Sequence, residues 1–160
     1  MLHEVKQRLQ MKFINELVSR LEKRNIYMKP CTKSQMEKLI SIAKGRNLPQ
    51  SYIEFMSKMG DGGKFMRGDS CFMNEIEYLK EGALELLEEN ESKKMLTDED
   101  FVFWMSQGCM FCFFKLNEGD NLPVYFYNES GEDEFIKVAN SLTEFLINRL
   151  ELNGNLFKPK

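Results

Sequence analysis

One apolar stretch, residues 101–114, constrains the fold more than any other part of the chain. It holds six Phe or Trp residues and no charged residue. Read as strands, it is apolar on both faces, because Phe101 and Phe103 alternate with Val102 and Trp104. A segment of this kind must be covered on both sides, so we expect two central strands in a packed core. The Ser-Gln-Gly interruption makes the stretch too short for a membrane span and predicts a hairpin turn.

Helical patterns precede this stretch. Apolar residues recur every three or four positions over 2–26, which predicts one long amphipathic helix with a basic outer face. Ser34 and Glu37 have the spacing of a capping box that opens a second helix. Pro49 suits the first turn of a third helix, and Gly60 is expected to end that helix as a left-handed cap.

Further elements follow from the same periodicities. Ile40 is expected on the buried side of the second helix. Residues 64–67 predict a short strand, and residues 74–90 predict a fourth helix with Leu84 on its buried side. Gly82 weakens that helix locally.

The second half of the chain reads as a meander followed by a helix. The expected strands are 101–105, 108–116, 122–127 and 134–138. Ser141 and Glu144 form a capping box for the last helix. These elements predict an α+β fold: a helical N-terminal layer, a central, mostly antiparallel sheet of about four to six strands, and a C-terminal helix packed on the sheet.

The length of 160 residues predicts one domain. We expect residues 1–30 to form a helix of the same domain as residues 31–152, and residues 153–160 to form a tail. Charges interrupt residues 2–21 every two or three positions, so no signal peptide is expected there. The expected location is therefore the cytoplasm.

Charge is distributed unevenly along the chain. Residues 1–60 carry 12 Lys or Arg against 5 Asp or Glu, and residues 61–160 carry 10 against 20. A basic N-terminal helix could lie on nucleic acid or on a membrane, but interleaved glutamates favour an ordinary solvated helix face. We therefore expect neither direct nucleic-acid binding nor membrane binding. The acidic part bears on the choice of a protein partner and on the rate of association.

The four cysteines, Cys31, Cys71, Cys109 and Cys112, are expected to be reduced. Cys109 and Cys112 have C-x-x-C spacing, which could suggest zinc or redox chemistry. Residues three apart in a strand point to opposite faces, however, and the single histidine, His3, is far away in sequence. We expect no metal, no cofactor and no catalytic set. A cysteine-dependent enzyme stays open as the weaker alternative.

Three segments together resemble the SUKH superfamily, which includes a fungal cell-wall-synthesis regulator, the bacterial Syd protein and many bacterial immunity proteins. Residues 48–63 resemble the family's helix that begins with Leu-Pro and ends in a Gly-rich turn. Residues 103–127 resemble its aromatic Gln-Gly hairpin and Pro-Val-Tyr strand, and residues 138–146 resemble its closing helix. Ser106 departs from the pattern, because many relatives carry His there. The residues that carry the resemblance, all with expected structural roles, are Pro49, Tyr52, Phe55, Gly60, Gly63, Gln107, Gly108, Pro123, Val124, Tyr125, Ser141 and Phe145.

The resemblance implies a non-enzymatic immunity protein that binds and neutralises a cognate polymorphic toxin, often a nuclease in this family. A scaffold or regulatory binding protein is the alternative. An acidic half suits a basic toxin, because complementary charge accelerates encounter. The residues expected to face the partner are Glu118, Asp120, Glu129, Glu132, Asp133 and Glu134. Ordinary solvated turns would have the same composition. The sequence leaves the oligomeric state open.

Overall fold

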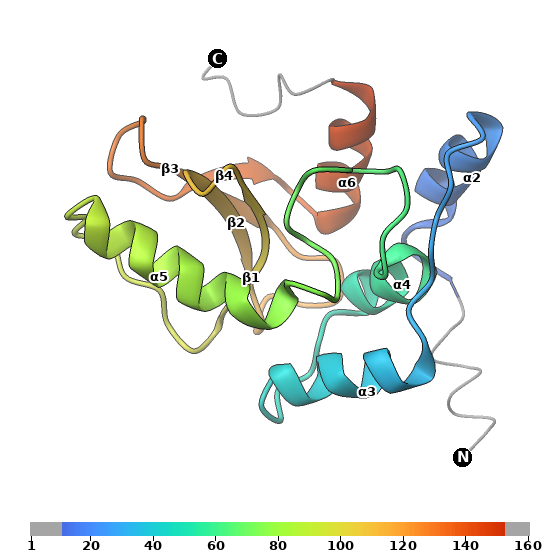
Figure 1. Cartoon of the computed structure of the whole chain (residues 1–160), viewed down its shortest axis with the longest axis horizontal. Helices are drawn as coiled ribbons and strands as arrows, with labels where there is room; N and C mark the ends of the chain where they lie inside the picture. The colour runs from blue at the N-terminus through green and yellow to red at the C-terminus, as the bar shows by residue number, and fades with distance from the viewer. Residues whose placement is uncertain (1–10, 153–160) are drawn as a thin grey trace.

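A computed structural model describes residues 11–152 and shows helices packed around one antiparallel sheet (Figure 1). The helices are α2 (Asn15–Lys23), α3 (Lys33–Ile42), α4 (Gln50–Met59), the short 3₁₀ helix η1 (Ile76–Tyr78), α5 (Leu79–Glu89) and α6 (Leu142–Glu151). The strands are β1 (Asp100–Ser106), β2 (Met110–Lys115), β3 (Val124–Asn128) and β4 (Ile136–Ala139). The expected α+β class is confirmed, including the antiparallel sheet and the C-terminal helix that packs on it. The expected tail, 153–160, lies outside the described residues.

The sheet runs in the order β1-β2-β3-β4, with every neighbouring pair antiparallel. The expectation of two central strands is therefore wrong for β1, which lies at an edge. Its edge is covered at one end, where Ser70 and Met105 exchange two backbone hydrogen bonds of 2.9 Å. Irregular chain can shield a strand from water as a neighbouring strand does, so burial on both faces did not reveal the strand order.

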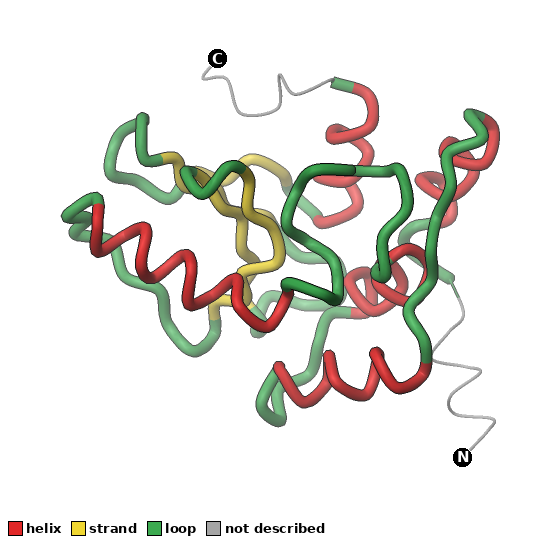
Figure 2. The backbone as a smooth tube through the Cα atoms, in the orientation of Figure 1, coloured by secondary structure: helices red, strands yellow, loops and turns green. Residues whose placement is uncertain are grey.

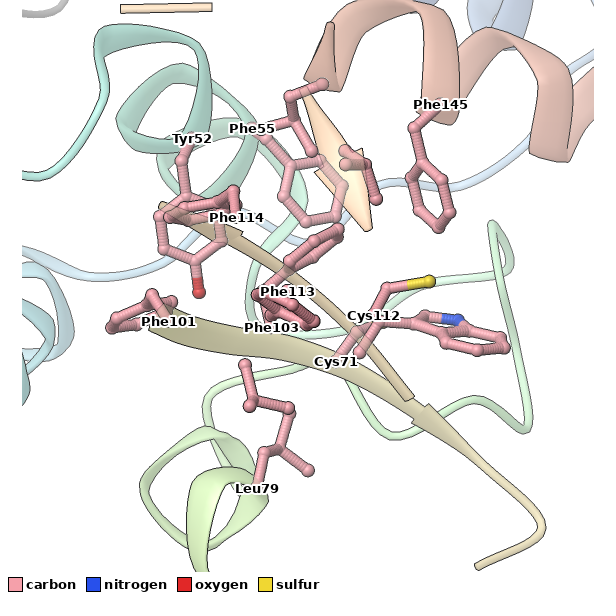
Figure 3. Packing of buried hydrophobic residues seen from close by; sticks show 14 of the residues in the cluster. Tyr52, Phe55, Cys71, Leu79, Phe101, Phe103, Cys112, Phe113, Phe114 and Phe145 are labelled. Carbon is pink, nitrogen blue, oxygen red and sulfur yellow. The ribbon is translucent and has the colours of Figure 1, made fainter. Parts of the chain in front are cut away.

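One face of the sheet packs against α4 and α6. Tyr52 of α4 lies within ring-contact distance of Phe101 and Phe114, with centroids 5.4 and 5.2 Å away (Figure 3). Phe145 of α6 meets the ring of Phe103 edge-on at 5.4 Å. All these side chains are buried, so the aromatic stretch is a packed core as expected.

The opposite face of the sheet packs against α5. Buried side chains of α5, including Ala83 and Leu87, point toward it. Gly82 brings the helix close, because a Cβ atom built there would lie 3.2 Å from Met105 Sδ. Covering both faces in this way satisfies the requirement that residues 101–114 impose.

The loop between α4 and η1 (Figure 2) is attached to the sheet by a partly buried polar network. Asp69 Oδ2 accepts hydrogen bonds from Trp104 Nε1 at 2.8 Å and from Arg149 Nη2 at 2.7 Å. The guanidinium of Arg149 also lies 5.4 Å from the centre of the Trp104 ring. One carboxylate thus joins the loop, β1 and α6. The expected strand at 64–67 is wrong, because these residues form a bend and turns between two isolated bridges, at Gly63 and at Ser70.

The hairpin turn between β1 and β2 lies where the Gln-Gly pair predicts it. Gln107 and Gly108 have φ values of 54° and 67°, and Cys109 N donates to Ser106 O at 3.2 Å. Two consecutive positive φ values are typical of a type I′ turn, which favours glycine at its second central position. Gly108 therefore has a conformational reason to be present.

The N-terminal helix is shorter than expected. The first part of the predicted helix lies outside the described residues, and residues 11–14 are not helical. Instead, the backbone N–H groups of Lys12 and Phe13 donate to Oε1 of Glu54, at 2.6 and 2.8 Å. Phe13 O accepts from Thr143 Oγ1 at 3.1 Å, so this segment contacts both α4 and α6. A buried carboxylate far along the chain overrides the local helical pattern.

The capping box of α3 lies two residues earlier than expected. Thr32, not Ser34, is the N-cap: its side chain accepts from Gln35 N at 3.1 Å, and Gln35 Oε1 accepts from Thr32 N at 2.8 Å. Both Thr and Ser satisfy the motif, and packing decides between the two registers. Ile40, expected inside, is 51% exposed, and Leu84 of α5 is 46% exposed.

Two glycines around the end of α4 are required for different reasons. Gly60 has a φ of −73°, so the expected left-handed cap is wrong. The space that a side chain at Gly60 would need is instead filled, because a Cβ atom there would lie 2.7 Å from Cys31 Sγ. Gly63 has a φ of +118°, and a Cβ atom there would overlap Tyr27 O. The backbone of Tyr27 thus excludes a side chain at Gly63, whereas Met56 O, 2.6 Å from the Cβ position, excludes one at Gly60 together with Cys31 Sγ.

The last helix begins as predicted. Ser141 is the N-cap of α6, and its hydroxyl accepts from Glu144 N at 3.1 Å. The returning bond of the box is shifted by one residue, because Glu144 Oε2 accepts from Asn140 N. The backbone N–H groups of Glu144 and Asn140 nevertheless both have a side-chain acceptor at the start of the helix.

Candidate partner-binding surface

The six carboxylates expected to face a partner are all exposed, but they lie in two separate turns. Glu118 and Asp120 are in the turn between β2 and β3. Glu129, Glu132, Asp133 and Glu134 are in the turn between β3 and β4. Successive turns of an antiparallel meander alternate between the two ends of the sheet, so the structure does not bring the two groups together.

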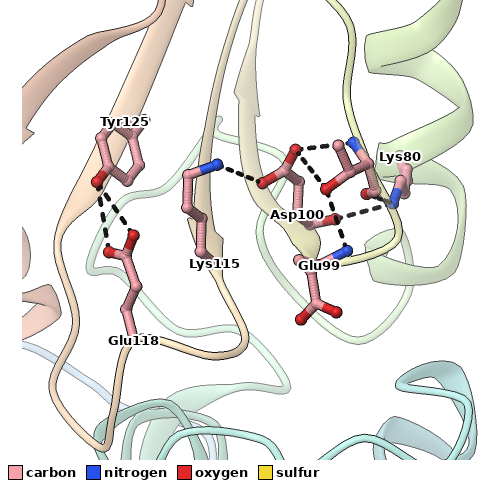
Figure 4. Close-up of polar contacts among 7 residues, drawn as sticks. Lys80, Glu99, Asp100, Lys115, Glu118 and Tyr125 are labelled. Atoms are coloured by element: carbon pink, nitrogen blue, oxygen red, sulfur yellow. Dashed lines mark hydrogen bonds and ion pairs between the residues drawn. The ribbon is translucent and has the colours of Figure 1, made fainter.

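At the β2–β3 end, the acidic residues make local contacts. Glu118 accepts from the Tyr125 hydroxyl, with oxygen distances of 3.3 and 3.4 Å (Figure 4). Burial raises the pKa of Tyr125, and the neighbouring negative charge of Glu118 raises it further. The backbone oxygen of Asp120 accepts from Ser51 N at 2.9 Å. These contacts attach the turn to β3 and α4.

At the β3–β4 end, the acidic turn is held by the loop that follows α5. Asp133 accepts hydrogen bonds from the Ser92 hydroxyl and, at 2.8 Å, from Lys93 N. These hydrogen bonds lower the pKa of the Asp133 carboxyl below its ordinary value, and the bond from Ser92 has the largest effect. Glu134 lies 3.0 Å from Lys94 Nζ. The turn and the end of α5 therefore form one continuous surface.

This contact adds the C-terminal end of α5 to the predicted acidic turn. Three exposed carboxylates lie at the end of α5 and just beyond it, before Ser92: Glu88, Glu89 and Glu91. We call the combined surface the acidic end; it consists of Glu88, Glu89, Glu91, Glu129, Glu132, Asp133 and Glu134. Only the half in the β3–β4 turn is foreseen from the sequence, because the α5 glutamates alone look like a solvated helix face.

The residues in the α5 half of the acidic end destabilise the C-terminal end of this helix. Carboxylates near a helix C-terminus oppose the helix dipole, and the last turn of α5 carries no basic residue. Glu91 also has a φ of 52°, a conformation that usually falls to Gly or Asn after a helix. A helix that ends in glutamates without any lysine or arginine is the sequence signal that could have found this half.

Three of the four thiols are poorly suited to nucleophilic chemistry. Burial raises the pKa of Cys71 and Cys112 well above the ordinary thiol value, and it raises the pKa of Cys31 to about 12. Because the thiolate is the reactive species, these groups are poor nucleophiles. Cys109 lies in the hairpin turn and Cys112 in β2, and the Cys109 thiol contacts Ser106 O at 3.7 Å.

Other kinds of site find little support in the part of the chain that the structure describes. Within residues 11–152, no group of three His, Cys, Asp or Glu side chains is placed to hold a metal ion. No helix in that range combines the length and apolar character needed to cross a membrane.

Comparison with known families identifies one family over most of the chain. No curated protein sequence matches the chain. The family SUKH_6, described as SMI1-KNR4 cell-wall, matches residues 35–146, which is 112 of the 160 residues. That range contains all four strands, α4 and the start of α6. Tyr52, Phe55, Val124 and Phe145 are fully buried in it, as the resemblance implies. The chain therefore belongs to the SUKH family.

Proposed function

We propose that this chain is a non-enzymatic immunity protein that binds and neutralises a cognate toxin in the cytoplasm. Family membership supports a role in protein binding, because the SUKH superfamily includes many immunity proteins. The acidic end carries the proposal: it presents seven exposed carboxylates on one continuous surface against two neighbouring lysines, Lys93 and Lys94.

The chemistry of the acidic end fits a basic partner, such as a nuclease domain that must itself attract a polyanion. Complementary charges steer two proteins together and raise the association rate, and salt weakens this effect. The dipole-opposing glutamates of α5 gain a role in this proposal, since binding offsets what they cost the isolated helix.

The test is co-expression with the toxin encoded beside this gene, scored by bacterial growth. The wild-type chain should restore growth. Replacing Glu129 and Glu132 by lysine should abolish rescue and slow association measured by surface plasmon resonance. The matched control replaces Glu22 and Glu37, exposed carboxylates of α2 and α3, by lysine, which gives the same change in net charge elsewhere.

Rescue that survives reversal of the acidic end but fails in the control would refute this surface. A toxin-free gene neighbourhood combined with no growth rescue would refute the immunity function itself. Affinity capture with mass spectrometry then separates the regulatory alternative, in which the partner is a cellular enzyme or scaffold and not a toxin.

A further inference from the structure

The helix α2 and the short segment before it are attached to both ends of α6. At the start of α6, Thr143 Oγ1 donates to Phe13 O at 3.1 Å. At its other end, Arg20 Nη1 and Arg24 Nη2 lie 3.2 and 2.5 Å from Oε1 of Glu151, the last residue of α6. The segment and α2 therefore lie along the length of α6 (Figure 1).

One apolar stripe joins this part of the chain, residues 11–24, to the core. We call it the strap helix. Ile14, Leu17 and Leu21 are fully buried, and their spacing of three and four residues places them on one side. All other residues of the strap helix are half-buried or exposed. A helix of nine residues is too short to persist alone in water, so α2 depends on this single contact stripe.

The buried acceptor that holds the start of the strap helix is only half satisfied. Glu54 of α4 is 1% exposed, and its Oε1 accepts from Lys12 N and Phe13 N at 2.6 and 2.8 Å. Its other oxygen, Oε2, is buried and has no hydrogen-bond partner among the described residues. A buried carboxylate with an unpaired oxygen costs free energy, and water would hydrate it once the strap helix moved away.

The chain that follows the strap helix is held by separate bonds. Lys29 N donates to Gly62 O at 3.2 Å, and Lys29 O accepts from Asp61 N at 3.0 Å. Between Lys29 and α2 lies Asn25, whose φ is 54°. A change of conformation at Asn25 would therefore release the strap helix and leave the bonds of Lys29 in place.

The charged attachment at the far end of the strap helix is open to water. The side chains of Arg20, Arg24 and Glu151 are between 32% and 44% exposed. Ion pairs of this kind contribute little to stability, and salt screens them. One apolar stripe, one half-satisfied carboxylate and exposed ion pairs are the features of a unit that opens more easily than the core.

We propose that the strap helix is a displaceable cover, which leaves α4 and α6 as one unit while the rest of the fold stays closed. The surface that it uncovers binds an amphipathic helix of the same pattern: apolar side chains at positions i, i+3 and i+7, with arginine or lysine near its end. In the closed chain, α2 is that helix. It lies outside residues 35–146, the range that matches the family. This inference does not depend on the toxin-binding proposal.

Amide hydrogen exchange of the full chain in low urea tests the opening. Amides of the strap helix should exchange at least about tenfold faster than those of β2. Leu17→Ala should speed exchange of the strap helix at least about tenfold, because an apolar anchor is lost. The matched control is Leu39→Ala, which removes an equally buried leucine from α3. It should speed exchange of β2 and leave that of the strap helix unaltered, because Leu39 stays packed when the cover opens.

A labelled peptide tests the uncovered surface. The probe is a fluorescein-labelled peptide of residues 11–25, and its receptor is the full chain carrying Leu17→Glu and Leu21→Glu, which keep its own α2 detached. Fluorescence anisotropy should show saturable binding to this double variant and at least about tenfold weaker binding to the wild type, whose cover is in place. A peptide that carries the same two substitutions is the control and should not bind.

Fluorescence of Trp104, the single tryptophan and a buried one, checks that the double variant is folded. If it does not fold, the exchange measurements alone decide. Three results would overturn the proposal. The first is exchange of the strap helix that is no faster than that of β2. The second is a Leu39→Ala chain in which both exchange faster by the same factor. The third is a folded double variant that binds the peptide no better than the wild type does.

Discussion

Gly63 allows the sharpest test of how the loop after α4 fixes the fold. Gly62 and Gly63 have nearly the same φ, +120° and +118°, but only Gly63 faces an obstacle. A Cβ atom on Gly63 would overlap Tyr27 O and lie 3.2 Å from Met28 Cα, whereas a Cβ atom on Gly62 meets nothing within 4 Å. Alanine at the two positions therefore compares backbone strain alone with strain plus collision.

The expected magnitudes follow from this geometry. Gly62→Ala should cost about 1–2 kcal/mol, which is the usual penalty of a positive φ for an L-residue. Gly63→Ala should add about 1–3 kcal/mol for overpacking. The collision would also push the Tyr27 backbone away and break the hydrogen bond that Lys64 N donates to Tyr27 O. This loss should add about 1 kcal/mol more. The total for Gly63→Ala is then about 3–6 kcal/mol.

Urea unfolding followed by far-UV circular dichroism measures both variants under identical conditions. The midpoint should shift at least about 0.7 M further for Gly63→Ala than for Gly62→Ala, given m-values of about 1–3 kcal/mol per molar urea. Equal free energies of unfolding, within about 0.5 kcal/mol, would refute the collision argument and leave the backbone conformation as the whole effect.

Three further outcomes are expected. Asp69→Asn should destabilise the fold by about 1–3 kcal/mol in urea unfolding, because the half-buried guanidinium of Arg149 loses its charged acceptor; Asp61→Asn, which removes a more exposed ion pair, should cost less. The pKa of Asp133 is lowered in the folded state, so the ionised carboxylate stabilises the fold above its unfolded pKa, and this stabilisation is lost as pH falls through its folded pKa. The difference in free energy of unfolding between wild type and Asp133→Asn should therefore vanish over that acid range. A difference that stays constant with pH would contradict this reasoning. Cys112 should resist alkylation by iodoacetamide in the native state at pH 8 and react after denaturation in urea, as judged by mass spectrometry, because its thiol is buried with a raised pKa.

Sequence patterns predicted the fold where local chemistry and packing agree. The burial of residues 101–105 and 111–114, the turn at Gln107-Gly108 and the start of α6 at Ser141 all follow from side-chain pattern or from a required backbone conformation. The errors lie where a distant partner decides. Glu54 binds the backbone of Lys12 and Phe13, and no local pattern announces that contact.

The candidate partner-binding surface could likewise be predicted only in part. Exposed acidic turns are visible in the sequence, because turn residues with charged side chains are solvated. The assembly of the acidic end is not visible, since it requires the contact of Asp133 with Ser92, 41 residues away in sequence. Nor does composition reveal the β1 edge, because strand order depends on how the strands pair and not on the polarity of each one.

The bond between Asp69 and Arg149 has a consequence for biosynthesis. These residues are 80 positions apart, and α6 leaves the ribosome after every other described element. Until then Phe103 and Trp104 lack the part of their cover that Phe145 of the same helix supplies. A chain cut before α6 is therefore expected to expose this aromatic surface and to aggregate more readily than the full chain.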